Sequence, residues 1–168
     1  MRKAVATPAI EIDVLPLPNA NKPANFAGAV GQYQLKATVD KTDVDTDEAI
    51  SFKVTLSGTG NIRMLPDPEV KIPTDFEQYD PEVTENISRQ NGIISGSKIY
   101  EYVLVPRFPG EQKIRPITYS FFDPRQKAYQ TLTAPEIIIN VAKGSGQFVA
   151  PGGSGLSKEE VRYVGQDI

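Results

Sequence analysis

The chain of 168 residues contains no histidine, no cysteine and no tryptophan. Without histidine it lacks the imidazole that acts as a base in serine hydrolases and as a ligand in many metal sites. Without cysteine it has no thiolate nucleophile, no redox pair and no thiolate zinc site. These absences remove the groups on which most hydrolases, oxidoreductases and transition-metal proteins rely. We therefore expect no cofactor, no metal site and no enzymatic activity.

Net charge is also small, and long apolar runs are missing. The sequence has 18 Lys+Arg against 21 Asp+Glu, a balance too acidic to grip a phosphate backbone. It has no run of about 18 apolar residues, the length a membrane-spanning helix requires. Met1-Arg2-Lys3 leads into residues 4–8 without the apolar stretch of a signal peptide. We expect no nucleic-acid partner and no membrane span, and we expect any leader and membrane anchor to lie outside these residues.

What the sequence does contain is alternation of apolar and polar residues with a period of two. In 33–39 the apolar side chains of Tyr33, Leu35, Ala37 and Val39 alternate with polar ones, and 50–56 repeats the pattern. Such alternation is typical of antiparallel strands with one buried face and one face in water.

Shorter signals of the same kind follow along the chain. Strands are predicted at 69–72, 76–79, 83–90, 98–105, 112–122, 129–132 and 137–141. Asn91-Gly92 predicts a tight hairpin turn, because both residues tolerate positive φ. Pro106 is expected to end one strand and Pro116 to divide another in two or kink it. The whole predicts an all-β, immunoglobulin-like antiparallel β-sandwich of about 100 residues.

Composition divides the chain around this sandwich, which we place at residues 31–142. Residues 16–30 are rich in Pro and Asn and are interpreted as a linker. The isolated alternation of Ile10 to Val14 marks residues 1–15 as the terminal strand of a preceding immunoglobulin-like domain, since a lone strand cannot bury its face. Residues 143–168 are interpreted as a Gly/Ser linker and a short helical tail, with a capping box at Ser157–Glu160.

An acidic stretch at residues 40–48 places Asp43, Asp45 and Asp47 two residues apart. It fails as a calcium loop of the EF-hand type, because Glu48 stands where glycine is needed and Val54 where the last glutamate belongs. The favoured interpretation is a solvated turn between two strands. Residues 57–61, with two glycines, are likewise interpreted as a turn that ends a strand, because no helix follows to form a phosphate loop.

Two functional alternatives remain open at this stage. Carboxylates at Asp80, Glu82, Glu101 and Asp123 could serve a glycosidase if a pair converged in a cleft, although charges on strands usually mark the wet face. Aromatic residues gather between Tyr100 and Tyr129, and an exposed coplanar set would make a carbohydrate-binding accessory module. Aromatic residues at strand spacing are more often part of the core.

Several segments in order resemble the Bacteroides aerotolerance protein BatD family, also called oxygen tolerance proteins. The stretches that carry the resemblance are Leu15-Pro16-Leu17-Pro18, residues 25–31, Ser57-Gly58-Thr59-Gly60-Asn61, residues 75–81, Gly96-Ser97-Lys98 leading to Tyr100-Glu101-Tyr102, residues 105–110, Phe121-Phe122-Asp123-Pro124 and residues 157–162. The set covers nearly the whole chain, and its specificity lies in order and spacing rather than in one motif.

The resemblance implies consecutive immunoglobulin-like domains in the periplasm, on a parent chain anchored in the inner membrane. It also implies partners of the von Willebrand factor A-domain and tetratricopeptide types and a MoxR-type ATPase, in a stress-related envelope complex. It supplies no catalytic residues. The expected function is a non-catalytic protein-interaction domain that presents loops and sheet edges, with Asp43, Asp45 and Asp47 as candidate partner-binding residues. The alternative is a carbohydrate-binding accessory module of an exported protein.

Overall fold

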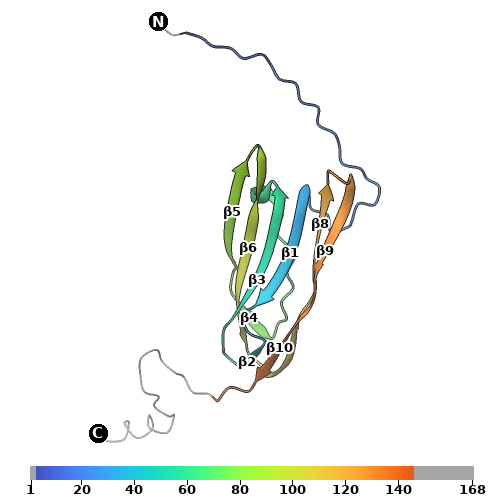
Figure 1. Ribbon diagram of the computed structural model, residues 1–168. Coiled ribbons are helices and arrows are strands. Elements are labelled where there is room, and N and C mark those ends of the chain that lie inside the picture. The colour runs from blue at the N-terminus through green and yellow to red at the C-terminus, as the bar shows by residue number, and fades with distance from the viewer. Residues whose placement is uncertain (1–2, 146–168) are drawn as a thin grey trace, which may run out of the picture.

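The computed structural model describes residues 3–145, and within them the chain forms ten β-strands and one short 3₁₀ helix. In chain order these are β1 (Gly31–Val39), β2 (Asp43–Asp45), β3 (Ile50–Gly60), η1 (Ile62–Met64), β4 (Phe76–Gln78), β5 (Glu82–Gln90), β6 (Ile93–Pro106), β7 (Gly110–Ile114), β8 (Ile117–Asp123), β9 (Ala128–Ala134) and β10 (Ile137–Ala142). The predicted all-β, sandwich-like fold is confirmed (Figure 1).

One layer is a five-stranded antiparallel sheet with β1, β3 and β6 side by side. The far edge of β6 pairs with β5 along its first residues and with β4 at its last ones. We call the end that carries the β5–β6 turn the upper end, and the end that carries β2 and β4 the lower end (Figure 1). Asn91 and Gly92 form that turn with φ of 50° and 76°, as the sequence predicts.

Alternation decides which side of this sheet is buried. Four apolar side chains of β3, from Ile50 to Leu56, are fully buried, whereas Lys53 between them is exposed. The outer face carries mostly Ser, Thr, Gln and Lys, and the inner face carries the core. The strands predicted at 33–39 and 50–56 are thus confirmed, and apolar area taken from water, at roughly 25 cal/mol per Å², stabilises the layer.

The second layer is one long bent hairpin. Its register, Ile114 with Ile137 and then Ile117 with Ala134, continues unchanged through the bend. Below the bend β10 pairs with β7 on one side and with β2 on the other. Above it β8 and β9 pack against β1, where the rings of Tyr33 and Phe121 meet edge to face at 5.5 Å. The predicted division of 112–122 at Pro116 is confirmed.

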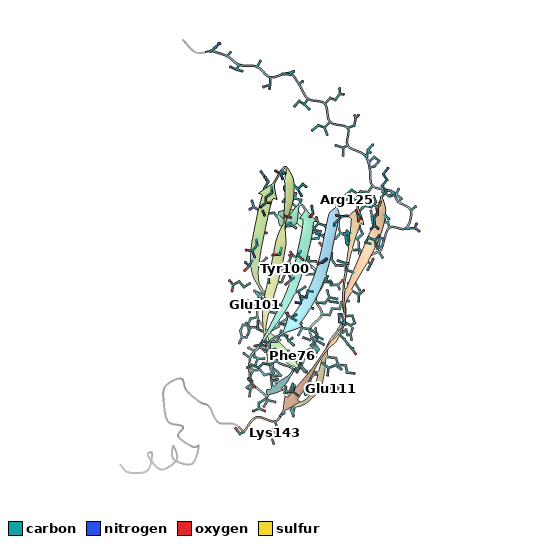
Figure 2. All side chains as sticks on the ribbon, viewed as in Figure 1. Phe76, Tyr100, Glu101, Glu111, Arg125 and Lys143 are labelled. Carbon is teal, nitrogen blue, oxygen red and sulfur yellow. The ribbon has the colours of Figure 1, made fainter. Side chains whose placement is uncertain are left out.

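The core lies between these layers. Its buried members are Ala29, Tyr33, Val44, Ile50, Phe52, Val54, Leu56, Ile62, Leu65, Phe76, Tyr100, Leu104, Ile114, Ile117, Tyr119, Phe121, Ala134, Ile139 and Val141. Tyr100 reaches the middle of this core from β6 (Figure 2).

Three local predictions were wrong. Residues 69–72 form no strand, since prolines at 66, 68 and 73 remove donors that a ladder needs. Residues 57–60 continue β3 instead of ending it, because Gly58 and Gly60 tolerate the close approach of β1. Asp43–Asp45 form a strand that pairs in parallel with β10. The acidic stretch is therefore not only a turn, and the sandwich contains a parallel pair of strands.

Residues before β1 divide into two parts. The segment 10–14 forms no ladder and its Ile10, Ile12 and Val14 are exposed, and whether it completes a preceding domain stays a prediction. Residues 16–30 were expected as a linker, and from Pro18 onward they contact β8 and β9. Tyr129 donates a hydrogen bond to the carbonyl of Pro18 at 2.6 Å, and Phe26 meets the Tyr129 ring at 5.0 Å. The tail helix predicted from Ser157 lies outside the described residues.

Candidate functional site at the lower end

The three aspartates singled out by the sequence all lie at the lower end. Asp43 and Asp45 flank the buried Val44 in β2 and are exposed, because a strand turns successive side chains to opposite faces. Asp47 lies in the following turn with φ of 67°. The structure therefore brings the three residues to one end of the sandwich without converging their carboxylates.

Asp47 is held by an arginine from a different turn. Arg107 donates to Asp47 Oδ1 at 2.5 Å and also pairs with Glu77 from β4. The backbone supports the same junction, since Asp47 N donates to the carbonyl of Pro106 at 2.8 Å and Arg107 N to that of Asp75 at 2.9 Å. Three segments distant in sequence are thereby joined into one surface.

Asp43 is also engaged. Asn140 of β10 donates its amide Nδ2 to Asp43 Oδ1 at 3.1 Å, and Thr42 donates to Oδ2 at 3.3 Å. Asp45, by contrast, is exposed, and among residues 3–145 its carboxylate makes no hydrogen bond or ion pair. Asp45 is therefore the carboxylate of the three that is available to a partner.

Glu48 closes the acidic turn. Its Oε2 accepts from the Asp45 backbone N–H at 3.1 Å, and its Oε1 pairs with Lys41 at 2.5 Å. The hydrogen bond from Lys41 holds the pKa of Glu48 below its usual range, with the Asp45 N–H acting in the same direction. These contacts fix the shape of the turn that carries Asp45.

Phe108 is an exposed aromatic residue of this end, as is Tyr79 after β4. Phe108 follows Arg107 in the β6–β7 turn and its side chain is 59% exposed. Because Arg107 ties that turn to Asp47, the ring of Phe108 is presented on the same end of the sandwich as Asp45. The sequence placed Phe108 among the aromatic residues considered for a carbohydrate platform, but it did not indicate that this ring is exposed beside the acidic turn, because exposure in a turn cannot be read from alternation.

The carboxylates considered for a glycosidase do not form such a site. Glu82 and Glu101 are cross-strand neighbours on the exposed outer face of the sheet, whereas Asp123 lies at the upper end beside Arg125 (Figure 2). Ser51 donates to Glu101 at 2.6 Å and holds the pKa of Glu101 low. A general acid needs the opposite shift.

The aromatic residues considered for a carbohydrate platform are mostly core. Tyr100, Tyr119 and Phe121 are each no more than 5% exposed. The hydroxyl of Tyr119 donates to the carbonyl of Pro66 at 2.9 Å, so it fastens the irregular segment after η1 to β8. No exposed coplanar set arises from these rings.

A polar cluster at the rim of the core lies beside them, with Tyr100 and Lys98 buried and the carboxylate of Asp67 exposed. Tyr100 donates to Asp67 Oδ1 at 2.7 Å, and Lys98 donates to the same oxygen and to the carbonyl of Leu65, both at 3.3 Å. The Tyr100 hydrogen bond lowers the pKa of the Asp67 carboxyl. Every partner belongs to this chain, so the cluster anchors residues 65–67 to β6.

Two further features, a cluster of metal ligands and a membrane-spanning helix, are absent from residues 3–145. No group of three acidic side chains there is arranged to hold a metal ion. Nor is any helix within residues 3–145 long and apolar enough to cross a membrane.

Comparison with known proteins gave one match. A protein-family model described as a BatD DUF11 like domain matches residues 37–141, from near the end of β1 into β10. No match was found among curated proteins or among solved structures.

Proposed function

Since this chain belongs to the BatD family, whose model covers residues 37–141, we propose that its sandwich is a non-catalytic domain that binds partner proteins through the lower end. The observation that carries the proposal is the junction made by Arg107. It ties the turn that carries the exposed ring of Phe108 to Asp47, which follows the free carboxylate of Asp45 by two residues.

This arrangement suits protein recognition on physical grounds. An exposed aromatic ring supplies contact area at a small entropic cost, and aromatic residues, phenylalanine included, are enriched at protein interfaces. A neighbouring carboxylate adds orientation and attraction to a cation. Because Arg107 and Glu48 already fix the turns, little ordering is required on binding.

The partner that fits best is a von Willebrand factor A-domain protein of the same periplasmic envelope complex. If such a domain carries a metal with an open coordination position, Asp45 is the carboxylate to complete it. Tetratricopeptide proteins and a role in oxygen tolerance belong to the same proposal and rest on family membership.

The proposal is tested by titrating the purified chain against the A-domain protein, with magnesium and with chelator. We expect Asp45→Asn to weaken binding in magnesium by about tenfold or more, and Phe108→Ala to weaken it in both buffers. Asp13→Asn, an equal charge change far from the lower end, should have no effect. Unchanged affinity after Asp43, Asp45 and Asp47 are all changed to Asn would exclude the acidic turn as the contact.

A further inference from the structure

The outer edge of the five-stranded sheet is formed by β5. Its nine residues are all exposed, and only one of its two edges is paired, to β6 (Figure 1). The register from Glu82–Glu101 to Gln90–Ile93 has no bulge, and the strand contains neither Pro nor Lys. Bulges, proline and lysine, three of the devices that protect an edge strand from pairing, are therefore missing from β5.

The hairpin turn decides which backbone groups face outward. Residues that flank a two-residue turn form a hydrogen-bonded pair, so Gln90 and Ile93 bond to each other. Alternation along the ladder then turns the backbone N–H and C=O of Val83, Glu85, Ile87 and Arg89 away from β6. The free edge thus presents a regular row of donors and acceptors.

The side chains of those same four residues share one face, the side of the sheet on which Tyr100 is buried, because Val83 stands opposite Tyr100. Ile87 is 40% exposed, Glu85 lies 3.5 Å from Arg63 of η1, and Arg89 forms no ion pair among the described residues. Along this face an acidic residue, Glu85, and a basic residue, Arg89, therefore flank the apolar Ile87.

This row is complementary to itself when reversed. If a second strand of the same sequence is laid antiparallel with Ile87 opposite Ile87, Glu85 falls opposite Arg89 at both ends of the contact. Residues 85, 87 and 89 all turn their backbone N–H and C=O groups away from β6, so in this register the two strands can form hydrogen bonds with each other. Directly opposed Cβ atoms lie roughly 5 Å apart, within reach of a glutamate–arginine pair.

We propose that two copies of this chain associate through β5, antiparallel and across a two-fold axis at Ile87, so that their sheets become continuous. Each copy contributes the same patch, as a closed two-fold interface requires. Two Glu85–Arg89 pairs between copies set the register, and the Ile87 side chains meet at the centre. The interface is separate from the lower end and does not depend on the function proposed for it.

Another segment of this chain could compete for the edge. Residues 10–14 alternate and lack a partner, but within one chain they follow a tether at Pro18, fixed by Tyr129 of β9. From there the four residues 14–17 span at most about 14 Å. The free edge of β5 lies beyond β1, β3 and β6, at about 4.8 Å a strand. Only a second copy could donate that segment, and such a dimer would not use Glu85 or Arg89.

Charge reversal tests the pairing. Sedimentation over a concentration series should show the unmodified chain passing from monomer to dimer, whereas Glu85→Arg and Arg89→Glu should each stay monomeric. An equimolar mixture of the two variants should again form dimers, because one strand then presents two arginines and the other two glutamates. Glu82→Arg is the control, since residue 82 would lie opposite the uncharged Gly92; its dimer should persist.

Thermal unfolding of every variant establishes that the fold is intact. Monomer at all concentrations for the unmodified chain overturns the proposal. So does a mixture that fails to associate, or dimers of either single variant as stable as those of the unmodified chain, the result expected if residues 10–14 were donated instead. Asp45→Asn should leave the dimer unchanged, which separates this test from that of partner binding.

Discussion

Pro116 and Pro135 stand directly opposite each other in the bent hairpin, because the register is Ile114–Ile137 below them and Ile117–Ala134 above. Neither has an N–H to donate, so the ladder is interrupted in both strands at one level. The lower half is then free to pair with β2 while the upper half covers the sheet beside β1.

Replacing one of these prolines tests how the bend is stabilised. Pro135→Ala should lower the free energy of unfolding by about 0.5–1 kcal/mol, because the unfolded chain gains freedom that the folded bend does not recover. Urea unfolding of the two proteins measures the difference. A more stable variant would contradict the view that the bend suits proline.

Gly58 should resist substitution more than any turn glycine. A Cβ there would lie 1.9 Å from the carbonyl oxygen of Gln32, and its φ is 150°. Gly58→Ala should therefore cost more than about 3 kcal/mol, because the clash is with backbone of the paired strand. Gly92→Ala is the matched control, since nothing lies within 4 Å of its Cβ, and should cost about 1 kcal/mol. Equal losses in thermal or urea unfolding would refute the argument.

Tyr100→Phe should change the acid stability. The Tyr100 hydroxyl lowers the pKa of Asp67 below its ordinary value of 3.8 in the folded state. A depressed folded pKa gives stability that is present above the unfolded value and is lost as the pH falls through the folded one. We expect the variant to lose about 1 kcal/mol at pH 7 and to show a smaller further loss between about pH 4 and pH 2. Urea unfolding at both pH values measures this, and parallel losses in the two proteins would contradict it.

Alkaline pH should unfold the protein through its buried tyrosines. Burial raises the pKa of Tyr119 and of Tyr100 above the ordinary 10.0. A raised folded pKa gives stability that is present below the unfolded value and is lost as the pH rises above it. Tyrosinate absorbance of these residues should therefore appear together with unfolding above about pH 10. Tyr119→Phe should make the loss of stability with pH less steep, and early reversible ionisation in the folded chain would disprove the coupling.

Phe26→Ala should loosen the segment that precedes β1. Phe26 contacts the ring of Tyr129 edge to face, and the ring of Tyr129 also contacts that of Phe122, with their centroids 5.1 Å apart. Without Phe26 the amide of Phe122, which donates to the carbonyl of Ala29 at 2.9 Å, should exchange faster with solvent. Amide hydrogen exchange measures this, with Phe108→Ala as a control that removes an exposed ring of the lower end. Equal protection in both variants would show that the aromatic contact does not hold the segment.

The positions that sequence alone could not place are those that depend on distant partners. The acidic stretch at 43–45 becomes a strand only because Asn140 of β10 donates its N–H to the carbonyl of Thr42 at 2.7 Å. Nothing local signals a pair separated by nearly the whole domain. The same holds for Arg107, whose role at the candidate site follows from Asp47 and Glu77, two residues far from it along the chain.

Alternation, turn chemistry and proline were enough to predict that the chain is all-β, where the central parts of β1, β3, β5 and β6 lie, and that the hairpin divides at Pro116. These are local properties, since whether a side chain is apolar every second residue needs no knowledge of its neighbours in space. Tertiary structure alone decided the parallel pairing of β2 and which of three aspartates keeps a free carboxylate. Those outcomes depend on which distant donor reaches each group, because a backbone or carboxylate oxygen is satisfied by whatever folding brings beside it.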